Sequence, residues 1–184
     1  LGVALPPAGP MPDYQVDDML GWQRDNAGRW WVGIHIDNGR IRDRDGATVM
    51  SGLREIFRRF QPDVLITPKQ DLLLVGIADE DRRQIQDIID QNGMNTDKTD
   101  GLRALAMACP ALPTCSLALA EAERAIPRLL RRLEELGHGD DSVQILMSGC
   151  HNSCVNTPLG EIGIAGCRPG KYSLMVGGNR QGTR

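Results

Sequence analysis

Four of the five cysteines in this chain lie in two short segments. Five residues separate Cys109 from Cys115, and three residues separate Cys150 from Cys154. Proline and small residues surround both pairs, which favours tight loops. Four thiolates that two such loops bring together are a suitable ligand set for an iron–sulfur cluster. The spacing therefore makes electron transfer the leading hypothesis for the chemistry of this chain.

Three other interpretations of these cysteines remain open at this point. Four thiolates also bind zinc, although zinc sites usually separate the members of each pair by two to four residues. A disulfide framework is typical of small secreted chains with an even number of cysteines, whereas this chain has five cysteines in 184 residues. Ordinary buried thiols are the third alternative. Free thiols in this number predict a reducing compartment such as the cytoplasm.

The elements that precede the cysteines predict a compact α+β unit. Strands are expected at residues 30–36, 64–66 and 72–77, with Asn38-Gly39 as a turn signal after the first. Ser51 is expected to cap one helix, and a second helix is expected to begin at Asp79 and to end at Asn92-Gly93. The apolar faces of these helices are Leu53, Ile56, Phe57 and Phe60 in the first and Ile85, Ile88 and Ile89 in the second.

The cysteine segments are expected to lie where regular elements end. A long helix is predicted from Ser116 to Leu136, with a kink or break at Pro127. Its inward-facing residues would be Leu117, Ala120, Ala125, Leu129, Leu130 and Leu133. Strands are predicted at residues 144–147, 161–166 and 172–176, and the first runs directly into Gly149-Cys150. Such loops leave backbone N–H groups free to point at cluster sulfurs.

Composition bounds the class of protein. The apolar fraction of 41% and the formal net charge of −3 are those of an ordinary soluble protein. No apolar run approaches the roughly 20 residues of a membrane helix, and no basic tract indicates a nucleic-acid partner. Arg128, Arg131 and Arg132 are interpreted as a solvated helix face. Because the chain starts at Leu1 and stops at Arg184 directly after a glycine-rich loop, we expect it to be a piece of a longer chain.

Several motifs in this chain resemble, in the same order, those of the sulfite and nitrite reductase family. Residues 106–124 and 149–154 are similar to the two cluster motifs of that family, and residues 169–174 and 177–184 to its closing strand and loop. Residues 38–41 and 66–72 resemble the half-domain that precedes the cluster motifs. The resemblance covers roughly Gly21 to Arg184. It implies an α+β fold in which a ferredoxin-like half-domain is followed by a sirohaem- and 4Fe–4S-binding domain.

The resemblance also implies a domain organisation. Residues 1–20 would be a linker or extended arm, residues 21–94 the ferredoxin-like half-domain, and residues 95–184 the cluster domain, truncated at its C-terminus. In the family, two similar halves form one pseudo-symmetric enzyme, and this chain resembles only the second half. The arginines and lysines that grip the oxyanion belong largely to the first half, so the missing first half is an expected partner.

The resemblance implies the ligands and the activity. Cys109, Cys115, Cys150 and Cys154 would hold one 4Fe–4S cluster, and Cys154 would also bridge to the iron of a sirohaem. The implied activity is six-electron reduction of sulfite to sulfide, as in assimilatory sulfite reductases, with electrons from ferredoxin or a flavoprotein. Residues 118–124 favour sulfite, whereas Asn152-Ser153 leans towards nitrite reductases, which form ammonia. A related enzyme of cobalamin synthesis and a non-enzymatic electron-transfer domain stay open.

Other residues have less defined roles. Gln70, Asn179 and Arg180 are candidate partners for the acidic periphery of sirohaem. The amide of Asn152 is a candidate donor to a cluster sulfur or a sirohaem carboxylate, and a turn role is the alternative. Cys167 is interpreted as a structural thiol.

The chain also departs from the family pattern beside the second cysteine pair. The family commonly has proline where His151 stands, glycine where Ser153 stands, and a small residue followed by arginine where Val155-Asn156 stands. His151 is interpreted as a surface imidazole, with proton donation as the alternative. These changes leave the cysteines intact and alter the charge beside them.

Overall fold

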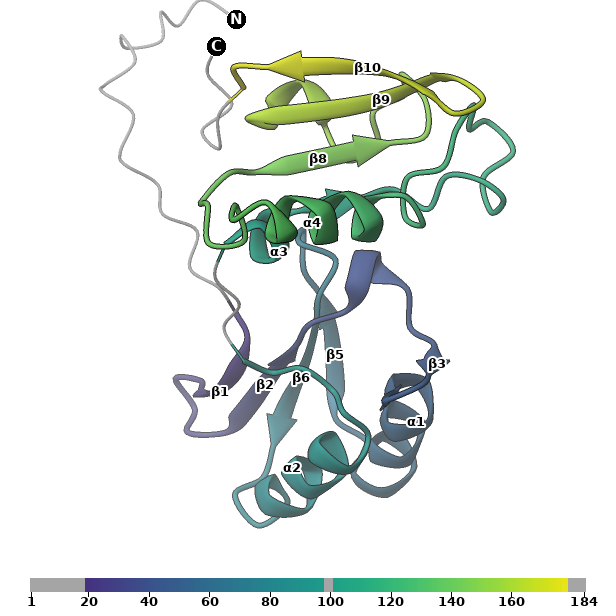
Figure 1. The fold of residues 1–184 in the computed structure, drawn as a ribbon. Coiled ribbons are helices and arrows are strands. Elements are labelled where there is room, and N and C mark those ends of the chain that lie inside the picture. Colours follow the sequence, from purple (N-terminus) through teal and green to yellow (C-terminus); the bar gives the residue numbers. More distant parts are fainter. Residues whose placement is uncertain (1–18, 98–100, 179–184) are drawn as a thin grey trace, which may run out of the picture.

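The computed structural model describes residues 19–97 and 101–178, and these residues form two α+β units, one above the other in Figure 1. The first unit comprises residues 19–97, and the second unit comprises residues 101–178. Each unit has its own four-stranded sheet and its own hydrophobic core. The mixture of helices and strands agrees with the fold class expected from the sequence. The expected arm at residues 1–20 lies almost entirely outside the described residues.

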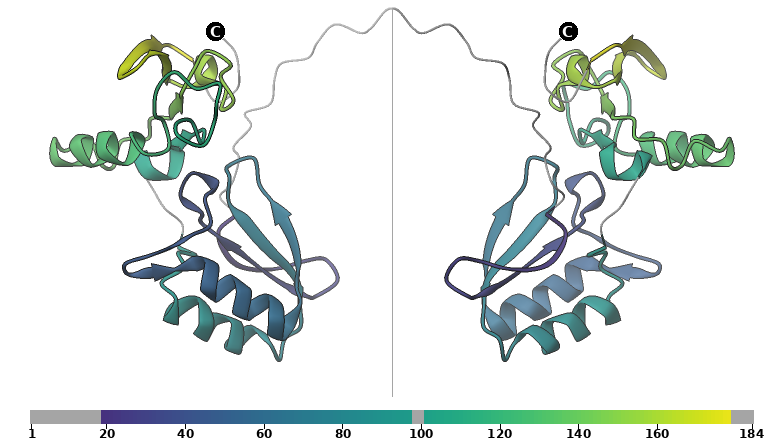
Figure 2. Two further views of the ribbon diagram at one scale, coloured as in Figure 1. Left: turned by 90° about the vertical axis from the view of Figure 1, so that its right-hand side faces the viewer. Right: turned by 90° about the vertical axis from the view of Figure 1, so that its left-hand side faces the viewer.

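The first unit is an antiparallel sheet with two helices packed on one face (Figure 2). In spatial order its strands are β1 (Gly21–Arg24), β2 (Trp30–Ile34), β6 (Leu72–Ile77) and β5 (Asp63–Ile66). The helices are α1 (Val49–Phe60) and α2 (Arg82–Gln91). A 3-10 turn at Asp37–Gly39 and a small ribbon of β3 (Asp43–Arg44) and β4 (Ala47–Thr48) connect β2 to α1.

The core of the first unit follows the predicted apolar patterns. The isoleucines of α2 pack with Leu53 and Ile56 of α1 against the buried side of β2 and β6. Full burial of one such side chain contributes about 2 kcal/mol to the free energy of unfolding. Phe57 and Phe60 pack at the edge of this core and are only partly buried.

Two predicted helix starts are wrong, and in both cases the side chain has another partner. Helix α1 begins at Val49, and the Ser51 hydroxyl donates to Asp43 Oδ2 at 2.7 Å. Helix α2 begins at Arg82 instead of Asp79. Asp79 Oδ1 accepts hydrogen bonds from Trp30 Nε1 at 2.6 Å and from Arg24 Nη2 at 2.7 Å. Asp79 therefore fixes the β1–β2 hairpin and does not cap a helix.

The second unit has a mixed sheet. In spatial order its strands are β10 (Lys171–Val176), β9 (Ile162–Arg168), β8 (Ile145–Ser148) and β7 (Met107–Ala108). Strands β7, β8 and β9 run parallel, and β10 pairs antiparallel with β9. Its helical segments are α3 (Leu102–Leu105), α4 (Ile126–Glu135) and a 3-10 turn at Thr157–Leu159. The three strands predicted in this half are confirmed with small shifts of their ends.

The predicted long helix from Ser116 to Leu136 is wrong. Only α4 forms, and Pro127 lies in its first turn, where the missing proline N–H leaves no hydrogen bond unmade. The preceding residues form turns because the N–H groups of Leu119 and Ala120 donate to Gly149 O, at 2.9 and 3.0 Å. Leu117 is 67% exposed and does not face a core. Leu130 is buried as predicted, and Arg128 and Arg132 face solvent.

Candidate functional site

The two cysteine pairs follow neighbouring parallel strands. Cys109 comes directly after β7, and Cys150 comes two residues after β8 ends at Ser148. Because β7 and β8 run parallel, both segments leave the sheet at the same edge, as Figure 1 shows for β8 and the loop after β7. The N–H of Cys109 still donates to Met147 O at 3.0 Å, which continues the ladder by one residue. The strand pairing thus brings together the starts of two segments that are 40 residues apart.

Gly149 joins the two segments through its backbone. Its N–H donates to Cys109 Sγ at 3.3 Å, and its carbonyl accepts from both Leu119 and Ala120. A Cβ atom at this position would lie 2.5 Å from the Cβ of Ala111 and 2.7 Å from the carbonyl oxygen of Ala120. These distances are too short for any residue other than glycine. The close approach therefore explains the glycine before Cys150.

A turn with a left-handed residue holds the second cysteine pair. Ser153 has a φ of +55°, a conformation that costs a non-glycine residue about 1 kcal/mol. The Ser153 hydroxyl lies 2.5 Å from Thr157 Oγ1 and accepts from the Thr157 N–H at 2.9 Å. These bonds fix the turn at the position where the resemblance expects glycine. The left-handed residue is Ser153 and not Asn152, which is exposed.

The four thiols differ in their access to solvent. Cys109 is buried with 7% of its surface exposed, Cys115 and Cys150 are half-buried, and Cys154 is exposed. Within the described part of the chain, no three His, Cys, Asp or Glu side chains are grouped closely enough to hold a single metal ion. A tetrahedral zinc ion would need all its thiolates at about 2.3 Å.

Two buried polar atoms beside the cysteine segments lack hydrogen-bond partners. They are Gln70 Oε1 and Ser148 Oγ, and neither finds a partner among the described residues. Gln70 extends from the first unit, and its Nε2 donates to Ala108 O at 3.1 Å, directly before Cys109. Ser148 is the last residue of β8. Unpaired buried polar atoms are rare in folded proteins and often mark a position where a bound group supplies the missing partner.

A second side chain of the first unit, Arg40, also contacts the segment that begins at Cys109. Arg40 forms an ion pair through its Nε with Glu123 Oε1, and its Nη2 donates to Thr114 Oγ1 at 3.0 Å. Glu123 is 5% exposed, and the hydrogen bond to it raises the pKa of Arg40 above its ordinary value. Both residues lie inside motifs of the family resemblance, but neither was assigned a role from the motifs alone. Only their spatial contact indicates one.

The remaining candidate residues are less informative. Asn179 and Arg180 lie outside the described residues. Cys167 is half-buried on β9, with its Sγ 3.5 Å from Lys171 O, which fits a structural thiol. His151 is exposed, as expected for a surface imidazole.

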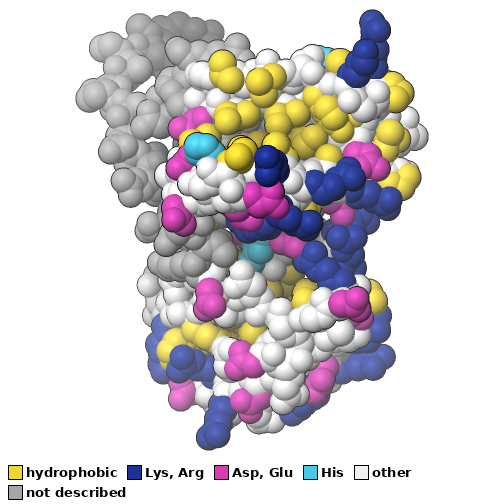
Figure 3. Space-filling model, viewed as in Figure 1, with side chains coloured by type: hydrophobic (Ala, Val, Ile, Leu, Met, Phe, Trp, Pro, Cys, Tyr) yellow, Lys and Arg dark blue, Asp and Glu magenta, His cyan; other side chains and the backbone are white. Residues whose placement is uncertain are grey.

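Exposed apolar side chains gather on the second unit (Figure 3). The large exposed apolar residues of this unit are Leu117, Leu119, Leu136, Leu159, Leu174 and Val176. Leu117 and Leu119 lie directly after Cys115, so apolar surface adjoins the cysteine segments. None of the helices in the described ranges is long and apolar enough to cross a membrane.

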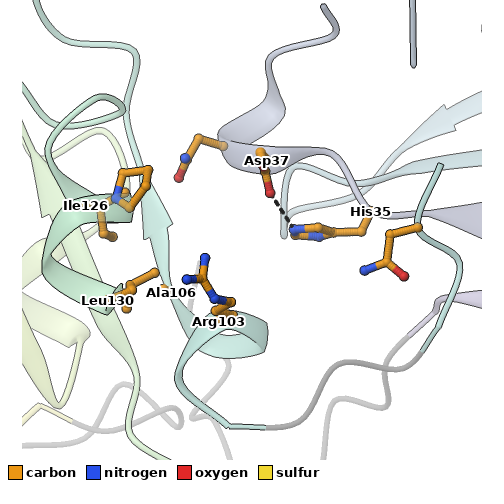
Figure 4. Close-up of a pocket in the computed structure, with 9 residues that line it drawn as sticks. His35, Asp37, Arg103, Ala106, Ile126 and Leu130 are labelled. Atoms are coloured by element: carbon orange, nitrogen blue, oxygen red, sulfur yellow. Dashed lines mark ion pairs between the residues drawn. The ribbon is translucent and has the colours of Figure 1, made fainter. Parts of the chain in front are cut away.

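A small cavity of about 140 Å³ lies between the two units (Figure 4). His35 and Asp37 line it from the first unit, and Arg103, Ile126 and Leu130 line it from the second. Each charged side chain that lines the cavity has a partner of opposite charge. His35 pairs with Asp37, and Arg103 pairs with Glu134. This cavity is therefore a polar junction between the units and is separate from the cysteine segments.

His35 is held between two carboxylates in this cavity. Its Nε2 lies 3.2 Å from Asp37 Oδ1, and its Nδ1 lies 2.8 Å from Asp71 Oδ1. The hydrogen bonds to Asp37 and Asp71 outweigh burial and raise the pKa of His35 from 6.5 to about 9. The hydrogen bond to His35 in turn holds the pKa of Asp37 below its ordinary value. The cation is therefore the stable form of His35 at neutral pH.

Replacing His35 with glutamine is expected to destabilise the fold in a pH-dependent manner. Because the folded pKa of His35 lies above the unfolded one, its stabilisation is complete below about pH 6.5 and is lost as the pH rises through about 9. At about 1.4 kcal/mol per pKa unit, the loss at pH 6 should be up to about 3 kcal/mol. Urea unfolding of both proteins between pH 6 and 10 measures this difference.

The exposed pair His138–Asp141 provides the control for this prediction. His138→Gln should change the free energy of unfolding by less than about 1 kcal/mol at every pH. A difference between wild type and His35→Gln that stays constant from pH 6 to 10 would contradict the assigned charge of His35.

Comparison with known protein families addresses the identity of the first unit. Residues 23–92 match the sequence model of the nitrite/sulfite reductase ferredoxin-like half domain. This range contains β2, β5, β6, α1 and α2 in full. The first unit belongs to the nitrite and sulfite reductase family. Membership confirms the resemblance drawn from the sequence motifs and assigns the first unit as a ferredoxin-like half-domain.

Curated members of the nitrite and sulfite reductase family match the whole chain. A ferredoxin-type sulfite reductase of Synechococcus elongatus is 39% identical, with 100% of this chain and 30% of the relative covered. The sulfite reductase (NADPH) hemoprotein beta-component of Chromohalobacter salexigens is 40% identical, with 100% of this chain and 33% of the relative covered. The chain thus spans about a third of the length of the curated relatives it matches.

Two solved structures have a similar fold. The NirA protein of Mycobacterium tuberculosis has a TM-score of 0.64 and 26% identity, with 86% of this chain and 29% of that chain covered. A dissimilatory sulfite reductase I has a TM-score of 0.51 at 12% identity, with 76% of this chain and 33% of that chain covered, and it supports the fold alone. Both comparisons span the two units.

Membership of the nitrite and sulfite reductase family implies iron–sulfur and sirohaem cofactors in general. The residues of this chain fit such groups on three observations. Two cysteine pairs begin at one edge of the sheet, the Gly149 N–H points at Cys109 Sγ, and two buried polar atoms beside them lack partners. The donor set of four thiols suits iron–sulfur chemistry.

Proposed function

We propose that this chain is the cluster-binding and cofactor-bridging part of a sulfite reductase, which reduces sulfite to sulfide with six electrons. The observation that carries the proposal is the convergence of Cys109 and the Cys150 segment at the common edge of β7 and β8. Relatives that are 39–40% identical over the whole chain and are named sulfite reductases support the choice of sulfite.

In this proposal four thiolates would hold one 4Fe–4S cluster, and Cys154 would also be a ligand of the sirohaem iron. The ligands are Cys109, Cys115, Cys150 and Cys154. The exposure of Cys154 suits a ligand that faces a second group, whereas the burial of Cys109 suits a ligand on the inner side. When bound, the coupled sirohaem and cluster would supply the one-electron redox chemistry that a six-electron reduction needs.

The other residues of the site would tune and orient these groups. The Gly149 N–H would donate to the Cys109 thiolate and stabilise its negative charge, which shifts the reduction potential of a cluster. Gln70 would keep its Nε2 on Ala108 O and offer Oε1 to a donor of the bound group. Asn152, Asn179 and Arg180 remain proposed contacts to the cofactor periphery.

In this proposal the cationic side chains that bind sulfite belong largely to another part of the enzyme. Electrostatic stabilisation of an oxyanion requires converging cations. Near the cysteine segments, Arg40 is already paired with the buried Glu123. We therefore propose that a first half, which makes up part of the remaining length of the relatives, completes the substrate site. Ferredoxin or a flavoprotein is the proposed electron donor, and the half-domain and cluster domain are proposed to divide near residue 95.

An anaerobic absorption spectrum, with iron, sulfide and sirohaem assays, tests this function. The protein should be produced with the sequence that flanks this chain in its gene. The expected result is about four cluster irons per chain together with the absorption of a coupled sirohaem. Turnover with sulfite should exceed turnover with nitrite when a chemical reductant replaces the natural donor.

Each alternative gives a different result in the same assays. Cluster absorption without sirohaem would replace the proposal with an electron-transfer domain. Faster turnover of nitrite than of sulfite would reassign the substrate, which the name of the matched half-domain family also includes. A colourless protein that contains zinc would overturn the proposal.

A further inference from the structure

Arg40 reaches from the half-domain to two points of the segment that carries the first cysteine pair. This segment, the Cys109–Glu123 loop, comprises residues 109–123. The Arg40 Nε pairs with the carboxylate of Glu123, the last residue of the loop. Its Nη2 donates to Thr114 Oγ1 at 3.0 Å, one residue before Cys115. One guanidinium therefore contacts the middle and the end of the loop at the same time.

The carboxylate of Glu123 needs this contact because it is buried. Glu123 is 5% exposed, and among the described residues the cation paired with it is Arg40. A buried carboxylate without a cation is strongly unfavourable. The backbone N–H of Glu123 donates to Cys109 O at 3.1 Å, so the position of Glu123 is coupled to that of Cys109. The Nε of the guanidinium contacts Glu123 and its Nη2 contacts Thr114, a planar two-point arrangement that a lysine ammonium cannot reproduce.

The other restraints on the loop come mainly from backbone hydrogen bonds and from the Tyr172 hydroxyl, which donates to Glu121 O at 2.8 Å. The inner part of the loop consists of turns, and its ends are fixed by Gly149, which binds Leu119 and Ala120, and by the β7 ladder. Cys115 lies between these fixed points and depends on the Ala111 carbonyl, which accepts its N–H at 2.7 Å. The side-chain contact of Arg40 with Thr114 is the nearest restraint from the other unit.

We propose that Arg40 is a positioning residue, which clamps the Cys109–Glu123 loop so that Cys109 stays buried and Cys115 keeps its place beside it. The half-domain is then part of the scaffold of the cysteine site and not only a neighbouring unit. The role of the clamp in cluster binding rests on the function proposed above, whereas the clamp itself is a property of the metal-free chain.

Alkylation of the metal-free chain, followed by peptide mass spectrometry, measures the clamp at each cysteine. Under anaerobic reducing conditions, Arg40→Ala should speed alkylation of Cys109 and Cys115 by about tenfold, because local opening exposes them. The rate at Cys167, on β9, should stay unchanged. Thr114→Val leaves the buried ion pair intact and should speed alkylation of Cys115 alone, and Arg40→Lys should behave like Thr114→Val.

Arg59→Ala is the matched control. Arg59 is an arginine of the same unit whose ion pair with Glu55 stays within α1. It should leave all five alkylation rates unchanged. Equal rates at Cys109 and Cys115 in wild type and in both Arg40→Ala and Thr114→Val would overturn the proposal. An equal acceleration of all five thiols in Arg40→Ala, with no effect in Thr114→Val, would also overturn it, since that pattern reports general unfolding.

The cluster-loaded protein separates this inference from the proposed function. If the clamp and the proposed function are both correct, Arg40→Ala should shift the electron paramagnetic resonance signal of the reduced cluster. Changed alkylation rates in a chain that never binds a cluster would retain the clamp and reject the function. A normal cluster in wild type with unchanged alkylation rates in both variants would retain the function and reject the clamp.

Discussion

Cys109→Ser is expected to remove nearly all cluster iron from the protein. Serine is close to cysteine in size, and its hydroxyl can accept from the Gly149 N–H, so the cost to the metal-free fold should be about 1–3 kcal/mol. A serine hydroxyl remains protonated at neutral pH and is a poor replacement for a thiolate ligand of iron. The iron content should fall from about four atoms per chain to less than one, and the visible absorption should disappear with it. Iron and sulfide assays on purified protein measure the loss.

Cys167→Ser is the matched control for this prediction. Cys167 is half-buried on β9, and its Sγ contacts only the Lys171 carbonyl among the described residues. Its replacement should leave iron content and absorption unchanged. Equal iron content in Cys109→Ser and wild type would contradict the ligand assignment. Equal losses in Cys109→Ser and Cys167→Ser would indicate that cluster loss follows from general instability.

Gly149→Ala is expected to separate the two cysteine segments. The new methyl group would lie 2.7 Å from the carbonyl oxygen of Ala120, a backbone atom that cannot move without breaking its loop. Overpacking of this kind costs about 3 kcal/mol. The shift should also lengthen the contact from the Gly149 N–H to Cys109 Sγ, so the buried thiol becomes accessible. Urea unfolding and the alkylation rate of Cys109 measure the two effects.

Gly139→Ala is the control for this substitution. A Cβ at Gly139 would meet its nearest neighbour, the Cγ of Glu134, at an ordinary 3.4 Å. This change should alter the free energy of unfolding by less than about 1 kcal/mol. If Gly149→Ala unfolds at the same urea concentration as Gly139→Ala, the close packing of the two loops is not the reason for the glycine.

The stabilities of the two units are linked by few contacts with different roles. His35 and Arg103 face a cavity between the units, and Gln70 and Arg40 reach the segment that begins at Cys109. We expect substitutions at His35 and Arg103 to change the free energy of unfolding in a pH-dependent manner. We expect substitutions at Gln70 and Arg40 to change the geometry of the cysteine segment. Substitutions at the two places should therefore have separable effects, since they share no partner.

The sequence alone determined the elements that depend on local patterns. The isoleucines of α2, the continuous apolar run of β6 and the turn after α2 all reflect spacing within about ten residues. The order of the cysteine motifs was sufficient to identify the family, because several short motifs in one order are far more specific than any one of them. These predictions needed no contact between distant residues.

Only the tertiary structure determined the region around the cysteines. Residues 116–125 have a helical apolar pattern, yet the Gly149 carbonyl, from a segment almost thirty residues away, takes the N–H groups of Leu119 and Ala120. The predicted helix start at Asp79 likewise failed because its carboxylate accepts from Trp30, 49 residues away. The contact of Arg40 with Glu123 spans 83 residues, and no local periodicity predicts it. Long-range hydrogen bonds and buried charges decide such positions, because an unpaired buried polar group costs more than local propensity can recover.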